Sequence, residues 1–540
     1  MKEFDFVIVG GGSAGCVLAD KLSENAEFTV CLIEAGPKDT HWSIHLPLGV
    51  IDLMKNKSLN WQFNSTPETT QNNRKVFNPR GKTLGGSSSI NAMLYIRGQK
   101  EDYNHWAELG NKGWSYAEVL PYFKAVENHE RGADEFHGVG GQLNVADSRS
   151  KPVIQDRFIA AAHNAGYPLN DDFNGKSQEG VGYYQLTQKD GQRCSAATAF
   201  LTPNLSRKNL TVITNAHVNE LLIKDKQAYG VNVTIKGVAI EIIARKEVLL
   251  CAGAFNSPQL LMLSGVGPKE ELTKHNISVK HELKGVGQNL QDHVDALVVS
   301  KHQHNELLAY RPKAINWFIK ESFKYFSLPF NKNTQRKGIL TSVVAEAGGF
   351  IKANKQSTRP DLQLHFIPAA MDDHGRNHKM LFNYGISLHV CLLRPKSRGE
   401  VKLFGKNPRL DPAITLNMLS DKNDQEYMIN AVKIARTILN QTPLIENNLA
   451  ELSPGKQVQS DEDILKFLKE KANTIYHPVG TCKMGQDDMA VVDNQLKVHG
   501  IENLRVIDAS IMPTLISGNT NAPTMMIATK AAEMILNEHC

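Results

Sequence analysis

The sequence lacks any long apolar run. A membrane-spanning helix needs about 18 or more consecutive apolar residues, and because no such stretch occurs we expect no transmembrane helix. The first apolar run, at residues 6–9, follows the acidic Glu3 and Asp5 and is broken by Gly10. This pattern is unlike that of a secretory signal peptide, so we expect the protein in the cytoplasm.

Paired cysteines are also missing. The seven cysteines are an odd number, are scattered along the chain and form no C-x-x-C pair. Their distribution argues against a disulfide framework and against a structural zinc site, and we expect no metal. Reduced thiols in a cytoplasmic protein fit the pattern best.

Neither sign of charge is in large excess. The 61 basic and 56 acidic residues leave a net charge of +5, and there is no basic tail, so we expect no nucleic-acid partner. The chain has 540 residues, which is too many for one simple core, and this predicts at least two lobes.

A glycine-rich turn lies close to the start of the chain. Residues 6–9 are a β-favouring run, residues 10–15 follow in the pattern G-x-G-x-x-G, and apolar residues then recur at helical spacing. A second β-favouring run, residues 29–33, ends at Glu34. The order strand, glycine turn, helix, strand and acid predicts a dinucleotide-binding unit.

Each part of this unit suits a dinucleotide. Gly10 allows the tight turn, Gly12 lets the backbone approach a pyrophosphate, and Gly15 permits close packing of helix on strand. The helix N-terminus offers free N–H groups to the phosphates. Glu34 can accept hydrogen bonds from ribose hydroxyls. The unit by itself does not distinguish FAD from NAD.

Later segments predict a lobe that is discontinuous in sequence. Residues 247–253 and 504–508 look like further buried strands of the nucleotide-binding sheet. Between them, residues 361–366 alternate between apolar and polar side chains, and residues 424–440 form an amphipathic helical pattern. We therefore predict an α/β protein, α+β overall, with a Rossmann-like lobe and a second lobe built on an antiparallel sheet.

Four stretches resemble the signatures of one enzyme family. Residues 81–91 are similar to the first signature of the glucose–methanol–choline (GMC) oxidoreductases, and residues 253–267 are similar to the second. Residues 476–485 look like the family's active-site histidine segment, and residues 285–293 resemble another family run. Within the family, the chain is most similar to the FAD-dependent alcohol dehydrogenases of alkane oxidation, and next to choline dehydrogenases.

The resemblance implies bound FAD and the GMC fold. It places an FAD-binding region at residues 1–297, a mainly substrate-binding lobe at 298–470, and a C-terminal segment at 471–540 that returns to the FAD lobe with the catalytic histidine. The C-terminal family region would span about residues 386–533.

The resemblance also implies two catalytic residues. An alcohol has a pKa far above 7, so its oxidation needs a positioned base and a group that stabilises the developing alkoxide. His477 matches the family's base. Asn521 matches the second position, where its amide can donate to the substrate oxygen; its alternative role is to cap the helix that follows.

The FAD contacts of the family fall on small residues, acids and amides. They are Gly10, Gly12, Ser13, Ala14, Gly15, Glu34, Ala35, Leu84, Gly86, Ser87, Asn91, Val218, Asp508 and Ala509. Asp508 has helix capping as its alternative. Some members attach FAD through a histidine at the position of Ile90. Because isoleucine has no nucleophilic atom, we expect non-covalent FAD.

Glu346 is a candidate substrate contact. It lies where choline-oxidising members place a carboxylate against the trimethylammonium group, but the alkane-pathway enzymes share this acid. A buried structural carboxylate is the alternative. The resemblance to the alkane-pathway enzymes implies oxidation of a primary, aliphatic alcohol to the aldehyde, with electrons passed to a quinone or another non-NAD acceptor. Choline oxidation, an oxidase using O2 and a lyase of the same fold are the alternatives.

A basic, aromatic segment raises the question of a membrane contact. Residues 311–337 carry seven basic residues and one acid, and apolar residues recur at helical spacing within them. The basic residues are Arg311, Lys313, Lys320, Lys324, Lys332, Arg336 and Lys337. Such a helix can lie on the inner face of the cytoplasmic membrane as a peripheral contact. Packing of its apolar face onto the second lobe is the alternative.

Overall fold

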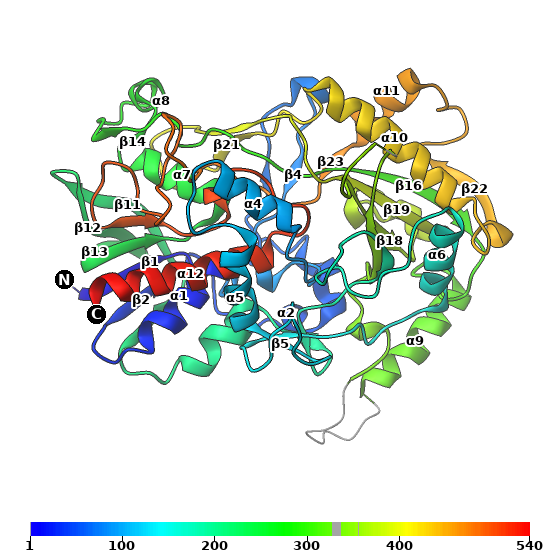
Figure 1. The fold of residues 1–540 in the computed structure, drawn as a ribbon, viewed down its shortest axis with the longest axis horizontal. Helices are drawn as coiled ribbons and strands as arrows, with labels where there is room; N and C mark the ends of the chain where they lie inside the picture. The colour runs from blue at the N-terminus through cyan, green and yellow to red at the C-terminus, as the bar shows by residue number, and fades with distance from the viewer. Residues whose placement is uncertain (1, 327–335, 355) are drawn as a thin grey trace.

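The computed structural model describes residues 2–326, 336–354 and 356–540. Two sheets dominate it, and each is the centre of one lobe (Figure 1). The first sheet lies on the left of Figure 1 together with both chain termini, and the second lies on the right.

The first sheet is built around the opening strand. Its order is β10 (Leu210–Ile213), β2 (Val30–Ile33), β1 (Lys2–Val9), β13 (Val238–Leu250), β12 (Gln227–Ile235) and β11 (Ala216–Lys224), and β24 (Leu504–Val506) also pairs with β13. The pairs of β1 with β2 and with β13 are parallel. All four residues of β2 are buried, as expected for a parallel strand covered on both faces.

The C-terminal segment completes this lobe. Helix α12 (Asn521–His539) lies against α1 (Ser13–Ser23), the helix that follows the glycine turn (Figure 1). Strand β24 runs parallel to β13. The first lobe is therefore assembled from both ends of the chain.

The second sheet is antiparallel throughout. Its order is β22 (Asn448–Ser453), β16 (Val294–His302), β19 (Gly385–Leu392), β18 (Leu362–Ile367), β17 (Ala347–Ile351) and β7 (Gly180–Tyr183), and β23 (Asn473–Thr474) also pairs with β16. The helices α10 (Lys422–Leu439) and α6 (Val153–Asn164) pack with this lobe. Helix α10 begins two residues before the predicted one, because Asp421 caps it by accepting a hydrogen bond from the Asn423 amide.

The boundary of the second lobe differs from the predicted one. Strand β7 and helix α6 come from within residues 1–297, yet β7 forms an edge of the second sheet by pairing with β17. Strand β17 pairs with β18 on one side, and the short strand β7 pairs with the backbone N–H and C=O groups on its other side. The predicted region 1–297 therefore contributes to both lobes.

Helix α9 (Pro312–Phe326) accounts for most of the described residues of the basic segment. Lys332 lies outside the described residues. Among the residues that the structure describes, no helix is long and apolar enough to cross a membrane.

Candidate active site

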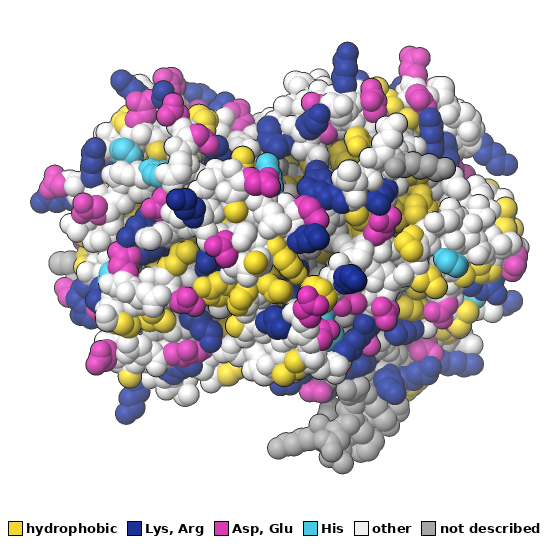
Figure 2. All heavy atoms as spheres, viewed as in Figure 1, with side chains coloured by type: hydrophobic (Ala, Val, Ile, Leu, Met, Phe, Trp, Pro, Cys, Tyr) yellow, Lys and Arg dark blue, Asp and Glu magenta, His cyan; other side chains and the backbone are white. Residues whose placement is uncertain are grey.

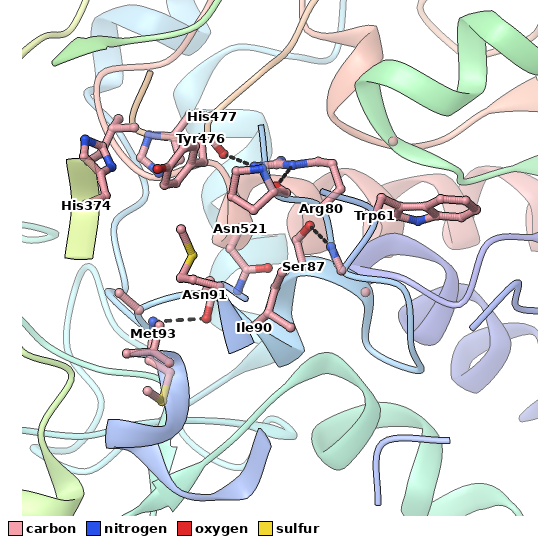
Figure 3. A pocket seen from close by; sticks show the side chains of 18 of the residues that line it. Trp61, Arg80, Ser87, Ile90, Asn91, Met93, His374, Tyr476, His477 and Asn521 are labelled. Atoms are coloured by element: carbon pink, nitrogen blue, oxygen red, sulfur yellow. Dashed lines mark hydrogen bonds between the residues drawn. The ribbon is translucent and has the colours of Figure 1, made fainter. Parts of the chain in front are cut away.

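A cavity of about 670 Å³ receives side chains from both lobes (Figure 3). Most of the predicted site residues line it: Gly10, Gly12, Ser13, Ala14, Glu34, Ala35, Gly86, Ser87, Asn91, Val218, His477, Asp508, Ala509 and Asn521. Three predicted residues, Gly15, Leu84 and Glu346, do not. The cavity therefore extends from the glycine turn to the histidine segment.

The glycine turn has the shape of a cradle. A Cβ on Gly10, which has a φ of +107°, would lie 2.5 Å from the Cys251 carbonyl oxygen, and one on Gly15 would lie 1.9 Å from the Gly10 oxygen. At Gly12 a Cβ would meet nothing closer than 4.0 Å, so the backbone there is open to the cavity. Gly15 thus serves packing, whereas Gly12 leaves room for a pyrophosphate at the N-terminus of α1.

Glu34 lies beside this cradle. Its two carboxylate oxygens accept hydrogen bonds from the Gly11 amide at 2.9 Å and from the Gly36 amide at 2.8 Å. Burial raises the pKa of Glu34 to about 7. Because each carboxylate oxygen can accept a second hydrogen bond, capacity for ribose hydroxyls remains.

Asn91 is held by a buried arginine. Its Oδ1 accepts hydrogen bonds from the Arg193 guanidinium at 2.8 Å and from the Met93 amide at 3.0 Å, so its NH₂ is left for the cavity. Arg193 also donates to the carbonyls of Ser88 and Ile44, and burial lowers its pKa to about 9. No motif in the sequence indicates that Arg193 orients this amide.

Asp508 caps the helix that follows it, whereas Asn521 does not. Asn521 is the first residue of α12 and makes no capping bond; its Oδ1 accepts a hydrogen bond from Ser13 Oγ at 2.8 Å. Its amide N–H groups are therefore available to the cavity. Asp508 caps a short helix by accepting from the Ser510 amide, and it also accepts from the Gly253 amide at 2.9 Å.

A chain of hydrogen bonds runs through His477. Its Nδ1 lies 2.9 Å from His293 Nδ1, and His293 Nε2 lies 3.0 Å from the Ile516 carbonyl oxygen. On its other side, His477 Nε2 lies 3.1 Å from Asn519 Nδ2, while Asn519 Oδ1 accepts from Gln363 at 3.1 Å.

This chain fixes the tautomer of His477. A carbonyl only accepts, so the proton of His293 is on Nε2, and burial keeps this imidazole neutral by lowering its pKa to about 4. The Nδ1 of His293 must then accept from His477 Nδ1–H. The Nε2 of His477 is left with a lone pair, which is what the Asn519 amide group requires.

The electrostatics keep His477 neutral. Burial, followed by the neighbouring His293 and His365, lowers the pKa of His477 well below its usual range. Its backbone is held as well, because the His477 amide donates to Asp292 at 2.9 Å. The preceding residue, Tyr476, has a φ of +72°, which is unusual for a non-glycine residue, and its carbonyl accepts from Arg80 at 2.6 Å. The turn therefore presents a neutral, oriented base.

A second histidine cluster lies beside the histidine segment, with the ring of His374 5.1 Å from that of Tyr476. Asp295 Oδ2 lies 2.7 Å from His389 Nδ1 and 3.2 Å from His374 Nε2, and both histidines line the cavity. Burial alone would raise the pKa of Asp295, but the two imidazoles hold it well below its usual range. The buried carboxylate is thus paired with imidazoles.

Glu346 does not contact the cavity, contrary to the prediction of a substrate contact. Its carboxylate accepts hydrogen bonds from Gln155 at 2.6 Å, from the Val343 amide at 2.9 Å and from Ser342 Oγ. Residues 343–345 line the cavity, and the Glu346 side chain is fully buried behind them. Glu346 directly precedes β17, and its side chain satisfies buried donors, which is the structural alternative.

Known proteins similar to this chain agree with these features. Two models of the GMC oxidoreductase family match residues 4–295 and 395–528. An alcohol dehydrogenase [acceptor] of Pseudomonas putida is 46% identical over 99% of this chain and 96% of its own length. A mitochondrial choline dehydrogenase of Mus musculus is 42% identical over 99% and 89%.

Solved structures extend the comparison to the fold. The crystal structure of pyridoxine 4-oxidase from Mesorbium loti has a TM-score of 0.89 and 30% identity over 99% of this chain and 100% of that one. A formate oxidase gives a TM-score of 0.90 at 28% identity, over 100% of this chain and 99% of that one. The chain therefore belongs to the GMC oxidoreductase family, and the predicted fold, FAD cofactor and oxidation of an alcohol are confirmed.

Proposed function

We propose that the protein oxidises primary aliphatic alcohols to aldehydes and passes the electrons to a quinone. The observation that carries the proposal is a neutral, oriented His477 in a cavity with an apolar outer half. That half is lined by Leu48, Ile51, Met54, Leu307, Leu308, Ile315, Phe318, Val344 and Ile367. An alkyl chain can be buried along these side chains.

Each residue would have a distinct part in the reaction. His477 takes the hydroxyl proton at Nε2, once the alcohol replaces Asn519 as the hydrogen-bond partner of that nitrogen. Asn521 donates an amide N–H to the developing alkoxide, because Ser13 already engages its oxygen. Gly12, Glu34 and Asn91 would hold FAD, which when bound would supply the acceptor for the hydride of the carbinol carbon.

The charges of the lining favour an aliphatic alcohol over choline. Among the described residues that line the cavity, the carboxylates are Glu34 and Asp508, both at the nucleotide end. Asp295, the acid of the second histidine cluster, is paired with His374 and His389. A trimethylammonium group would meet no free carboxylate in the outer half, and its desolvation would go uncompensated.

A membrane surface is the place that we propose for this reaction. The named relative from P. putida uses an acceptor, and a quinone acceptor is dissolved in the bilayer. All seven cysteines are free, and six of them are buried, which fits a reducing compartment such as the cytoplasm. A peripheral position on the inner membrane face would bring enzyme and acceptor together.

A substrate panel tests the proposed function. Anaerobic enzyme should be reduced rapidly by 1-octanol and slowly or not at all by choline or benzyl alcohol, with flavin absorbance as the signal. Turnover with 1-octanol should require a soluble quinone and should consume no O2 in its absence. Faster reduction by choline, or oxygen-driven turnover at the quinone-driven rate, would contradict the assignment.

Glu34 supplies a separate test of the cofactor site. Glu34→Ala should weaken FAD binding by about 10–10²-fold, the range for losing hydrogen bonds to a charged acceptor. Titration of apoprotein with FAD measures this, and turnover per bound FAD should be unchanged. Glu3→Ala, which removes an exposed acid from the neighbouring strand β1, is the control. Equal affinity in Glu34→Ala and wild type would show that another group holds the ribose.

A further inference from the structure

Helix α9 has two apolar faces, and one of them packs on the protein. Trp317, Phe318 and Tyr325 pack onto the second lobe, in the cluster that contains Leu48 and Leu340. The packing alternative predicted from the sequence therefore accounts for this inner face. It leaves the opposite face unexplained.

The outer face of α9 carries an apolar stripe. Ile315, Ile319, Phe323 and Phe326 recur at helical spacing and are exposed by 45%, 49%, 66% and 64%. Large apolar side chains gathered on one exposed helix face are uncommon on a soluble surface and mark an interaction site. We call these four residues the outer stripe.

Basic side chains flank the outer stripe. Lys313, Lys320 and Lys324 are exposed on the same helix, and its one acid, Glu321, is paired with Lys324 at 2.6 Å. Elsewhere, on the face shown in Figure 2, basic and acidic side chains are interspersed. A net positive helix with an apolar stripe complements an anionic lipid surface, which offers both charge and apolar burial.

The mouth of the active-site cavity opens on the same surface. Of the described residues that line the cavity, Ile51, Tyr310 and Ile315 are the exposed ones, by 42%, 50% and 45%. Ile315 also belongs to the outer stripe, and the ring of Tyr310 lies 5.4 Å from that of the exposed Phe382. The rim is therefore apolar and continuous with the stripe.

We propose that the outer stripe and this rim dock on an anionic bilayer, so that the alcohol enters the cavity from the lipid. The inference rests on the proposed oxidation of an aliphatic alcohol and narrows it to alcohols that partition into membranes. Entry from the bilayer keeps the alkyl chain in apolar surroundings from the lipid to Phe318 and Leu308 inside the cavity. The proposed substrate is therefore a long-chain alcohol that is dissolved in the membrane.

The experiment uses FAD-loaded enzyme and vesicles of phosphatidylcholine with or without phosphatidylglycerol. Ile319→Ser/Phe323→Ser/Phe326→Ser removes the part of the stripe that does not line the cavity. Leu205→Ser/Val238→Ser/Phe404→Ser, with exposures of 48%, 62% and 58% in the wild type, removes equally exposed apolar side chains elsewhere. Wild type and control should co-sediment with anionic vesicles at low salt and be released at high salt, whereas the stripe variant should bind about 10-fold more weakly.

Turnover measurements distinguish docking of the protein on the membrane from entry of the alcohol through the lipid. With a soluble dye acceptor, the stripe variant should oxidise 1-butanol in water normally but should lose most of its turnover of 1-dodecanol carried in anionic vesicles. Equal vesicle binding by wild type and stripe variant, or no binding by wild type, overturns the docking surface. Undiminished 1-dodecanol turnover by a non-binding variant overturns entry from lipid. Enzyme that binds through the stripe but oxidises neither alcohol supports docking and contradicts the proposed function instead.

Discussion

His477→Ala should slow reduction of the bound flavin by an alcohol about 10²–10⁴-fold, the usual share of general base catalysis. The loss is expected because the groups that contact or flank His477 cannot take its place: Asn519 and Asn521 offer amide groups, and His293 Nε2 donates to Ile516. Anaerobic stopped-flow absorbance measures the rate. The variant should retain bound FAD and its absorbance spectrum, since the imidazole of His477 is not part of the glycine turn proposed to hold the nucleotide.

The control for this substitution is another buried histidine. His302→Ala removes an imidazole of the second sheet whose Nε2 donates to the Leu444 carbonyl oxygen at 3.2 Å and which does not line the cavity. It should leave flavin reduction within a few-fold of wild type. Near-normal reduction in His477→Ala would remove His477 from the mechanism, whereas equal losses in both variants would indicate a general effect on the fold.

The pH dependence follows from the lowered pKa of His477. A base is active above its own pKa, and burial and the neighbouring histidines move that pKa downward. The rate of flavin reduction should therefore stay on its plateau as the pH falls through the ordinary histidine range of about 6.5. A fall in rate centred on that range would show that substrate binding or the cofactor restores an ordinary pKa.

Local patterns predicted the strand, the glycine turn and the acid that line one end of the cavity. Strand β1, the glycines at 10–15 and Glu34 lie within one short stretch of the chain. Their arrangement in space therefore depends on local structure, which a sequence pattern can indicate. The histidine segment was predicted by resemblance, and it lies on a turn that places His477 at the cavity. Both segments reach the cavity through a backbone shape that is set by residues close together in the sequence.

Partners that are distant in the sequence were not predicted. His293 and His477 are separated by 184 positions, and Arg193 and Asn91 by 102, yet each pair shares a hydrogen bond. The motif that contains His293 was recognised by resemblance, but a motif does not indicate which residue each ring nitrogen of the histidine contacts. Sequence pattern also left open the direction of the Glu346 side chain, which the fold turns toward Gln155.

Helix α9 shows why an amphipathic pattern is ambiguous. An apolar helical pattern predicts one buried face, and either the lobe or a membrane could provide the burial. The structure contains an inner face with Trp317 and Phe318 and an outer stripe that includes Phe323. Only the placement of the helix on its lobe distinguishes the two sets of side chains.

His293→Leu should lower kcat/KM for the alcohol by about 10–10²-fold, below the 10²–10⁴-fold share of the base itself. Leucine removes the acceptor of the His477 Nδ1–H, so the proton of His477 is no longer confined to Nδ1. Molecules that carry it on Nε2 cannot accept the substrate proton. The buried N–H left without a partner adds to the loss.

A positioning role for His293 differs from a purely structural one in three measurements. The FAD content and the KM for the alcohol should stay near the wild-type values, while kcat falls. His293→Asn should recover much of the rate, because an asparagine Oδ1 can accept from His477 at the place of the lost Nδ1. The acid limb of the pH profile should move to higher pH in His293→Leu, since His293 is one of the groups that lower the pKa of His477. An asparagine variant as slow as the leucine variant, with an unshifted acid limb, would leave His293 as a packing residue and leave the tautomer of His477 to another group.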